Sequence, residues 1–285
     1  MPQLSLPTLP RRLPNLPQSA QRGPGRPRTQ APKIRSTVIV SDLHLPLIDW
    51  PSYRAVVHFI KDKRPDYLFL NGDIIDCAEQ SRYEKSPAVF GQTEEELRLA
   101  NEILDELQEA SPTTIIKYIA GNHERRLAHR LYENPDLLSY LAPSGNPLEV
   151  LTIALNLDDR GIEFLDYPEA YNLYGFIITH GQATGQHPAK KEVERAGMPG
   201  CSGHCHRQRF WERKDRRGVV QWWSLGGLCS HDVDYIKNPD WVRGFGYLQQ
   251  IVDSDDFTFA SIPIITGKFL YDRVLYSQDG AFEAA

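Results

Sequence analysis

Polar residues that could bind a ligand follow several short apolar runs in this chain of 285 residues. Four strand-like runs lead into Asp, His or Asn, mostly beside a glycine, and a later turn repeats the pattern. In sheets built of alternating strands and helices, ligands bind beyond the carboxyl ends of the strands, and glycine lets the backbone approach them. The pattern therefore predicts a ligand site beyond the carboxyl ends of these strands. Its segments are Asp42–His44, Asn71–Asp76, Gly121–Glu124, His180–Gly181 and Gly203–His206.

The residue types in these segments are those of divalent metal sites. Carboxylate, imidazole and amide groups with little cysteine bind borderline-to-hard divalent cations. Seven or eight such groups are too many for one tetrahedral ion, but they suit two ions that share a carboxylate. Two ions about 3.5–4 Å apart clamp a phosphate and acidify a bridging water. The set therefore indicates chemistry on phosphate esters.

Strand-like and helix-like segments alternate in the first half of the chain, and strands dominate afterwards. Ser52 is expected to cap one helix, and Thr93–Glu96 forms the pattern of a capping box for a second. This order is typical of an α/β domain with mixed sheets, which we expect to cover residues 34–285. The expected strands are 37–40, 67–70, 113–119, 175–179 and 219–224.

The ordered motifs resemble those of the calcineurin-like metallophosphoesterases over about residues 36–250. They are Asp-x-His, Gly-Asp-x-x-Asp, Gly-Asn-His-Glu, His-Gly and Gly-His-x-His. The resemblance implies a four-layer α/β/β/α sandwich with two mixed β-sheets. The runs Gly121–Leu127 and Trp241–Phe245 look like those of a subgroup that is frequent in phages and prophages.

The same resemblance implies a centre of two divalent cations and assigns its ligands. Manganese is the preferred metal, and iron, nickel, cobalt or zinc also suit imidazole and carboxylate ligands. By resemblance, the first cation is held by Asp42, His44, Asp73 and His206, and the second by Asp73, Asn122, His180 and His204.

The implied reaction is hydrolysis of a phosphoester. Hydroxide bridging the metals attacks phosphorus, and His123, oriented by Asp76, protonates the leaving oxygen or stabilises its charge. Protein phosphatases of this superfamily carry an arginine directly after the second motif aspartate, where this chain has Cys77. This difference favours a phosphodiester, such as a nucleotide or nucleic acid. A small or protein phosphomonoester is the alternative. The candidate substrate-binding residues are Arg125, Arg126 and His231.

The first 33 residues differ in composition from the rest. They contain eight of the 21 prolines, so we expect them to be disordered or locally polyproline-like. Residues 1–35 hold seven of the 32 Lys and Arg and none of the 37 Asp and Glu, which leaves a charge of −12 on residues 36–285. A segment with Arg22, Arg26 and Arg28 resembles the AT-hook, whose arginine enters the minor groove of A·T-rich DNA.

The tail thereby adds nucleic acid as a candidate partner. A flexible basic arm would supply phosphate contacts that depend on salt. A solvated basic linker is the simpler interpretation of the same residues. A non-catalytic DNA-binding protein that retains the fold is the third function to weigh against the two esterase functions.

A compact zinc site is a competing interpretation of one motif. Cys201, His204, Cys205 and His206 are legitimate zinc ligands, although structural zinc sites usually draw pairs from two separate segments. If the two-metal interpretation holds, we expect Cys205 just behind the ligands.

Several other residues are expected to be structural. Cys77 and Cys229 are expected to be ordinary buried residues, and Trp222, Trp223 and Trp241 to pack in the core rather than stack a base. Without a CxxC pair, the cysteines suggest a reducing, cytoplasmic setting. No apolar run approaches the roughly 20 residues of a membrane span, so no membrane partner is expected. The oligomeric state stays open.

Overall fold

The computed structural model describes residues 32–82, 90–142, 144–216, 218–231 and 240–283. Its contacts divide the chain into residues 1–32 and residues 33–285, and the fold below is that of the second unit. Residues 1–31 of the predicted basic tail, with Arg22, Arg26 and Arg28, lie outside the described residues.

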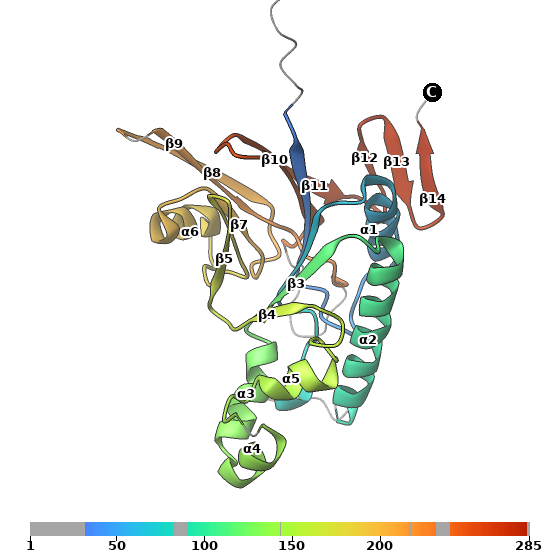
Figure 1. Ribbon diagram of the computed structural model, residues 1–285, viewed down its shortest axis with the longest axis vertical. Coiled ribbons are helices and arrows are strands. Elements are labelled where there is room, and N and C mark those ends of the chain that lie inside the picture. Colours follow the sequence, from blue (N-terminus) through green and yellow to red (C-terminus); the bar gives the residue numbers. More distant parts are fainter. Residues whose placement is uncertain (1–31, 83–89, 143, 217, 232–239, 284–285) are drawn as a thin grey trace, which may run out of the picture. The chain divides into compact units, whose positions relative to one another are not determined.

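A six-stranded mixed sheet forms the centre of this unit (Figure 1). Its strand order is β11-β10-β1-β2-β3-β4, and β1 to β4 run parallel while β10 lies antiparallel to β1. Strands inside a parallel sheet are buried on both faces, which explains the apolar β-branched run of β1. The strands are β1 (Ile34–Val40), β2 (Tyr67–Asn71), β3 (Ile115–Ile119), β4 (Glu163–Leu165), β10 (Arg243–Ile251) and β11 (Phe257–Ile264).

A second mixed sheet has the order β5-β6-β7-β9-β8. Its middle strands β6, β7 and β9 are parallel, and β5 and β8 pair antiparallel at the edges. The strands are β5 (Ala170–Leu173), β6 (Phe176–Thr179), β7 (Gly200–Ser202), β8 (Arg209–Asp215) and β9 (Gly218–Ser224).

The two sheets pack face to face between helices, as the alternation of buried side chains shows. Ile39 and Phe69 point toward the second sheet and share an apolar cluster with Ile178. Their neighbours along the strands, such as Val38 and Leu68, point the other way into the cluster under helices α1 (Trp50–Lys63) and α2 (Gln92–Ala110). Helix α6 (Pro188–Ala196) covers the outer face of the second sheet (Figure 1). The expected four-layer α/β/β/α sandwich is confirmed.

Two predicted helix starts are wrong in detail. Helix α1 (Trp50–Lys63) begins before Ser52, and its N-cap is Asp49, whose carboxylate accepts the backbone N–H of Ser52. Helix α2 (Gln92–Ala110) begins after Gly91 without a side-chain cap. Its Glu96 is buried and accepts the N–H of Cys77 instead of closing a capping box.

A third, three-stranded sheet of the described residues has no counterpart in the sequence prediction. It consists of β12 (Phe269–Tyr271), β13 (Val274–Ser277) and β14 (Gly280–Glu283), and it packs on α1. The ring of Phe59 in α1 makes edge contacts with Phe269 and Tyr276 of this sheet. The sheet thus closes the apolar cluster on the outer side of the helix.

Shorter helices connect the strands near the carboxyl edge of the central sheet. They are the 3-10 turn Ala78–Gln80 and helices α3 (Glu124–Tyr132), α4 (Pro135–Leu141) and α5 (Glu149–Ala154). Helix α6 connects β6 to β7 in the second sheet. Within the described residues, no helix combines the length and the apolar character that crossing a bilayer requires. The four cysteines are buried and free.

Candidate metal centre and catalytic site

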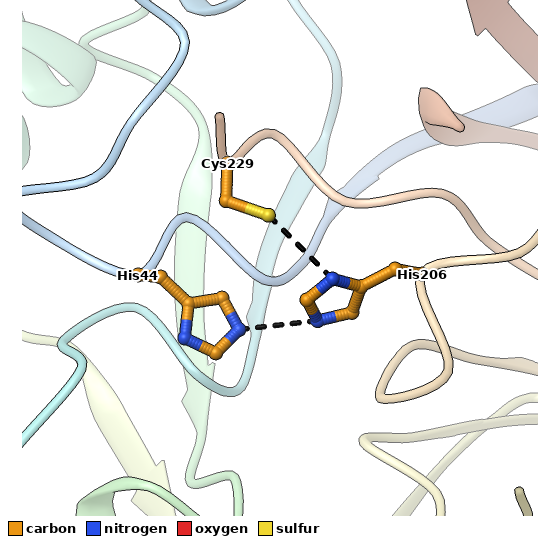
Figure 2. Close-up of side chains that lie close together, drawn as sticks. All are labelled: His44, His206 and Cys229. Atoms are coloured by element: carbon orange, nitrogen blue, oxygen red, sulfur yellow. Dashed lines mark hydrogen bonds between the residues drawn. The ribbon is translucent and has the colours of Figure 1, made fainter. Parts of the chain in front are cut away.

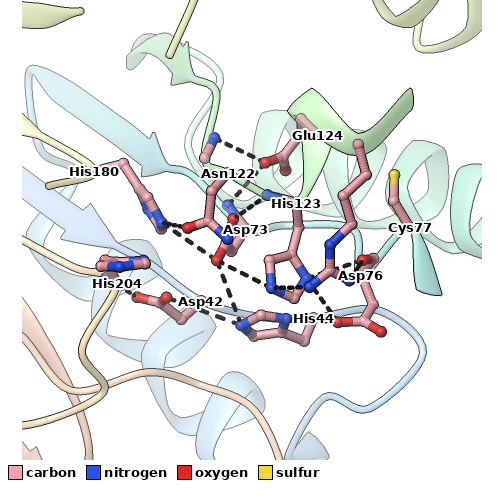
Figure 3. A network of polar contacts seen from close by, with 12 residues as sticks. Asp42, His44, Asp73, Asp76, Cys77, Asn122, His123, Glu124, His180 and His204 are labelled. Carbon is pink, nitrogen blue, oxygen red and sulfur yellow. Dashed lines mark hydrogen bonds and ion pairs between the residues drawn. The ribbon is translucent and has the colours of Figure 1, made fainter. Parts of the chain in front are cut away.

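The five polar segments predicted to share one site do lie together (Figure 3). Each follows the carboxyl end of a strand, namely β1, β2 or β3 in the central sheet and β6 or β7 in the second sheet. The site therefore spans the edge where both sheets end. No single sheet could bring these segments together, so the packing of the two sheets creates the site.

The backbone at the site is held in unusual conformations. Left-handed backbone outside glycine is uncommon and costs free energy, so it persists where surrounding structure demands it. Five of the seven predicted metal ligands have positive φ angles: Asp42 (56°), His44 (49°), Asp73 (51°), His204 (66°) and His206 (53°). These turns aim the side chains of successive loops at a common point.

Two glycines allow the loops to approach each other. A Cβ on Gly121 would lie 2.1 Å from Oδ1 of Asp73, and a Cβ on Gly72 would lie 2.4 Å from Nδ1 of His180. Gly72 also has a φ of 82°. Any larger residue at either position would displace a predicted ligand, which explains the Gly-Asp and Gly-Asn-His motifs.

One half of the centre contains Asp42, His44 and His206. Nε2 of His206 lies 3.1 Å from both Oδ1 of Asp42 and Nε2 of His44. Nε2 of His44 lies 3.8 Å from Oδ2 of Asp73. The second nitrogen of His44, Nδ1, lies 2.9 Å from Oδ1 of Asp76, so its Nε2 is the atom that faces the centre.

The other half contains Asn122, His180 and His204. Nε2 of His180 lies 3.2 Å from Oδ2 of Asp73 and 3.2 Å from Oδ1 of Asn122. His204 supplies a ligand atom within 4.8 Å of those of Asp73 and His180. Because Oδ2 of Asp73 faces both halves, its carboxylate is the group that two cations could share.

The residues fit cations on several grounds. Nδ1 of His180 lies 2.8 Å from the carbonyl oxygen of Asn71, which can only accept, so Nδ1 is the donor. In the neutral ring, the lone pair of Nε2 then faces two oxygens. Nδ1 of His204 is buried without a hydrogen-bond partner, and the buried Oδ1 of Asp42 lies 3.1 Å from Nε2 of His206. Buried polar atoms rarely stay unpaired, and a cation would satisfy all of them.

The electrostatics point the same way. Burial lowers the pKa of His180, but Asp73 outweighs it and raises the pKa to about 9. Burial likewise lowers the pKa of His206, yet Asp42 raises it well above the usual range. Burial raises the pKa of Asp73, and the surrounding histidines bring it well below its usual value. The cluster thus favours positive charge at its centre.

His123 lies beside this cluster and faces it with one ring nitrogen. Its Nε2 lies 3.8 Å from Oδ2 of Asp73, and its Nδ1 lies 2.8 Å from Oδ1 of Asp76. Burial lowers the pKa of His123, but Asp73 and Asp76 outweigh it and raise the pKa. The arrangement gives a ring that the carboxylate of Asp76 orients and whose Nε2 is directed at Asp73.

The two adjacent arginines differ in their contacts. The guanidinium of Arg126 lies 2.8 Å from Nε2 of His123 and donates to the carbonyl oxygen of Asp76 at 2.8 Å. Arg125 instead donates to the carbonyl oxygen of Tyr167. Of the two predicted phosphate-binding arginines, the structure therefore brings only Arg126 into contact with His123.

Glu124 organises the loops, a role that its place in the Gly-Asn-His-Glu motif did not reveal. It is fully buried, and its carboxylate accepts the N–H groups of Asp73 at 3.0 Å and Gly121 at 2.8 Å. It also accepts the hydroxyl of Tyr118 at 2.8 Å. The sequence shows an acidic residue three positions after Gly121, but it does not show that this residue binds the backbone of the Asp73 loop.

The zinc interpretation of the Gly203–His206 turn finds no support in the geometry. Cys201 is buried in the cluster between the two sheets, and Sγ of Cys205 faces the carbonyl oxygen of Arg207 at 3.5 Å. Among the described residues, neither cysteine belongs to a group of possible metal ligands.

Cys229 is not the ordinary buried residue that was expected. Its Sγ lies 3.5 Å from Nδ1 of His206 (Figure 2). The two residues are 23 positions apart in the sequence and lie in different loops. No local sequence motif therefore signals the contact.

The tryptophans divide between core and site. Trp222 is fully buried, and Trp223 packs on Phe176, as expected for core residues. Trp241 is half-buried, and its ring centroid lies 4.4 Å from that of His206, so the core assignment is wrong for this residue. His231 lies against Trp241, with ring centroids 6.2 Å apart.

The fold and the site define a metallophosphoesterase. A family model of the calcineurin-like phosphoesterases matches residues 36–248, and the chain belongs to this family.

Similar proteins include phage proteins. The chain is 28% identical over 261 residues to the Gene 54 protein of Mycobacterium phage D29, covering 82% of this chain and 96% of that protein. It is 28% identical over 254 residues to the Gene 54 protein of Mycobacterium phage L5, with the same coverage. These similarities confirm the predicted resemblance to a phage-type subgroup. Among solved structures, Vps29 of Chaetomium thermophilum matches with a TM-score of 0.42 and 11% identity, covering 88% of this chain and 100% of that one.

Proposed function

We propose that the protein is a dinuclear metal-dependent hydrolase of phosphodiesters. The observation that carries the proposal is the position of Asp73, whose Oδ2 faces His44 on one side and His180 on the other. Two divalent cations held there, with manganese preferred, would activate a water and neutralise the charge of the phosphate. The ligands of the two cations would be those that the resemblance implies.

The residues beside the cations have their own parts in the proposed reaction. Water would lose a proton to the solvent as it adds to phosphorus, the bond to the leaving oxygen would break, and Nε2 of His123 would donate the proton that this oxygen takes up. Asp76 holds the ring through Nδ1 and stabilises its charged form. After the reaction, His123 regains its proton from the solvent.

Arg126 would bind the phosphate next to His123. In the structure its guanidinium donates to Nε2 of His123. Once that nitrogen carries a proton, both groups are donors, and an anion placed between them can accept from both. A phosphate oxygen fits this requirement, so we assign substrate binding to Arg126 rather than to Arg125.

The residue that follows Asp76 favours a diester substrate over a monoester. Cys77 is fully buried there and offers no cation to a terminal phosphate. Nucleic acid or a nucleotide is the proposed class of diester, and the basic N-terminal tail is the proposed contact for a long polyanion. The proposed setting is the reducing cytoplasm of a host cell.

The test compares two substrates on one preparation loaded with manganese. We expect bis-p-nitrophenyl phosphate to be hydrolysed with a larger kcat/KM than p-nitrophenyl phosphate, and His123→Ala to remove most of the diester turnover. A preference for the monoester would replace the diester assignment with a phosphatase. Absence of metal-dependent turnover on both substrates would favour a non-catalytic DNA-binding protein.

A further inference from the structure

The imidazole of His206 is contacted at both nitrogens. On one side, Nε2 faces Oδ1 of Asp42 and Nε2 of His44, each at 3.1 Å. On the other side, Nδ1 faces Sγ of Cys229 at 3.5 Å (Figure 2). The ring therefore presents one nitrogen to the metal ligands and the opposite nitrogen to a sulfur atom.

A neutral histidine that binds a metal through Nε2 must carry its proton on Nδ1. That N–H needs an acceptor, and the acceptor fixes both the tautomer and the orientation of the ring. In other metal sites this acceptor is usually a carboxylate, a backbone carbonyl or a water. In the part of the chain that the structure describes, Sγ of Cys229 lies within hydrogen-bond distance of Nδ1.

We propose that Cys229 is a positioning residue for the first metal site. Its sulfur accepts the Nδ1–H of His206 and so keeps Nε2 free of a proton and directed at the cation. The inference rests on the proposed dinuclear function. It assigns to a cysteine outside all five motifs the task of setting the affinity of one of the two sites.

The backbone ties Cys229 to the loop that carries two other ligands. The N–H of Leu228 donates to the carbonyl oxygen of Asp42 at 3.0 Å, and the N–H of Asp49 donates to the carbonyl oxygen of Leu228 at 2.8 Å. The N–H of Ser230 donates to the carbonyl oxygen of Leu47 at 2.6 Å. The sulfur therefore keeps a fixed position relative to Asp42 and to the site.

Burial of both residues makes the contact important for the orientation of the His206 ring. Cys229 is only 3% exposed, and His206 is also buried. Water therefore does not readily replace the sulfur as the partner of Nδ1, so removal of the sulfur would leave a buried N–H unpaired. The expected consequence is a ring that turns or a proton that moves to Nε2, and either change weakens the first site.

A direct bond between Cys229 and a cation is the rival arrangement. The ligand atoms of His44, His206 and Cys229 lie within 4.8 Å of one another, so the three could form a ligand group. However, the nitrogen of His206 next to the sulfur is Nδ1, while Nε2 faces Asp42. A cation bound by both the sulfur and Nε2 would require the ring to rotate out of its present position.

The experiment measures the binding of manganese to each site by competition calorimetry. Cys229→Ala and Cys229→Val remove the acceptor in two ways, so that one of them remains informative if the other fails to fold. Cys229→Ser restores an acceptor. Cys201→Ala is the matched control, because Cys201 is also a fully buried cysteine but lies between the two sheets.

We expect the two acceptor-free variants to weaken one of the two sites by about 10- to 100-fold and to leave the other unchanged. Cys229→Ser should recover most of the lost affinity, and Cys201→Ala should bind both ions as the wild type does. Wild-type affinity at both sites in Cys229→Ala and Cys229→Val would overturn the inference alone. A wild-type chain that binds no manganese would instead contradict the proposed function itself.

Cobalt substitution separates positioning from direct ligation. A cobalt–sulfur bond produces a ligand-to-metal charge-transfer absorption, which a hydrogen-bonded thiol does not. We expect the wild-type protein loaded with cobalt to lack this absorption. Its presence in the wild type and loss in Cys229→Ser would make Cys229 a ligand and overturn the positioning role.

Discussion

Oδ1 of Asp76 lies 2.8 Å from Nδ1 of His123 and 2.9 Å from Nδ1 of His44, so one carboxylate oxygen orients two rings with different tasks. His123→Ala should lower kcat by about 100- to 10,000-fold, the usual contribution of a positioned acid, without loss of metal. Asp76→Ala should lower kcat similarly and also weaken the first cation, because His44 loses its partner. Steady-state kinetics and metal analysis of both variants check this difference. Full metal affinity in Asp76→Ala would mean that His44 does not depend on Asp76.

Metal stoichiometry tests whether Asp73 is shared. We expect Asp73→Ala to lose both cations, since its Oδ2 faces both halves of the centre. Asn122→Ala should lose only one, because Asn122 contacts His180 in one half. Elemental analysis after desalting measures the number of ions per chain. If Asp73→Ala retained one ion as firmly as Asn122→Ala does, the two halves would be independent sites.

The adjacent arginines provide a matched pair for substrate binding. Arg126→Ala should lower kcat/KM for a diester by about 10- to 100-fold, because a hydrogen bond to a charged group contributes about 1.5–3 kcal/mol. Arg125→Ala should leave kcat/KM near the wild-type value, because its guanidinium binds the backbone of Tyr167 instead. Kinetics with bis-p-nitrophenyl phosphate measure both. Equal losses in the two variants would contradict the assignment of phosphate binding to Arg126.

Glu96 should make the stability of the fold depend on pH. Burial raises the pKa of this carboxyl group to about 7, from 4.5 in the unfolded chain. The unfolded chain therefore releases the proton first, and the free energy of unfolding falls as pH rises between these two values. Relative to Glu96→Gln, the wild type should lose roughly 2–3 kcal/mol between pH 5 and pH 8.

Urea denaturation of both proteins at the two pH values measures this difference. Glu102→Gln is the control, because Glu102 lies on the same helix with an exposed side chain. A wild type and a Glu96→Gln variant with parallel pH profiles would show that Glu96 ionises normally in the folded protein.

The basic tail should strengthen the binding of polyanions and have no effect on the turnover of small substrates. Deletion of residues 1–33 removes six Lys and Arg. Because each phosphate contact contributes about 0.7–0.9 to the slope of log K against log salt, this slope should fall by up to about 4–5 for nucleic acid. Turnover of bis-p-nitrophenyl phosphate should not change. Filter binding at several salt concentrations measures the slope. An unchanged slope would show that the tail does not contact nucleic acid and is only a linker.

An AT-hook in the same tail predicts a preference for A·T-rich DNA. Arg26→Ala should weaken binding to A·T-rich duplexes more than to G·C-rich duplexes if the arginine enters a narrow minor groove. Equal loss on both duplexes would leave only a general charge effect.

The strands of the central sheet were predictable because their signal is local. The apolar run around Ile39 and the run around Phe69 are buried on both faces, and this burial requires apolar residues at every position. The helix caps were less predictable, because Thr93 and Glu96 form a cap pattern in sequence but bind other residues in space. Oγ1 of Thr93 donates to Glu79, and Glu96 accepts from Cys77.

The ordered motifs of the sequence pointed to the residues gathered at the candidate site. Asp, His and Asn that stand beside glycine at strand ends have few roles other than ligand binding. The choice between Arg125 and Arg126 depended on which guanidinium the turn of α3 brings to His123. The places of Glu124 and Cys229 also depended on tertiary structure, since each contacts a loop far away in the chain. A local pattern encodes which atoms can bind a cation, whereas the packing of two sheets decides which buried groups hold those atoms in place.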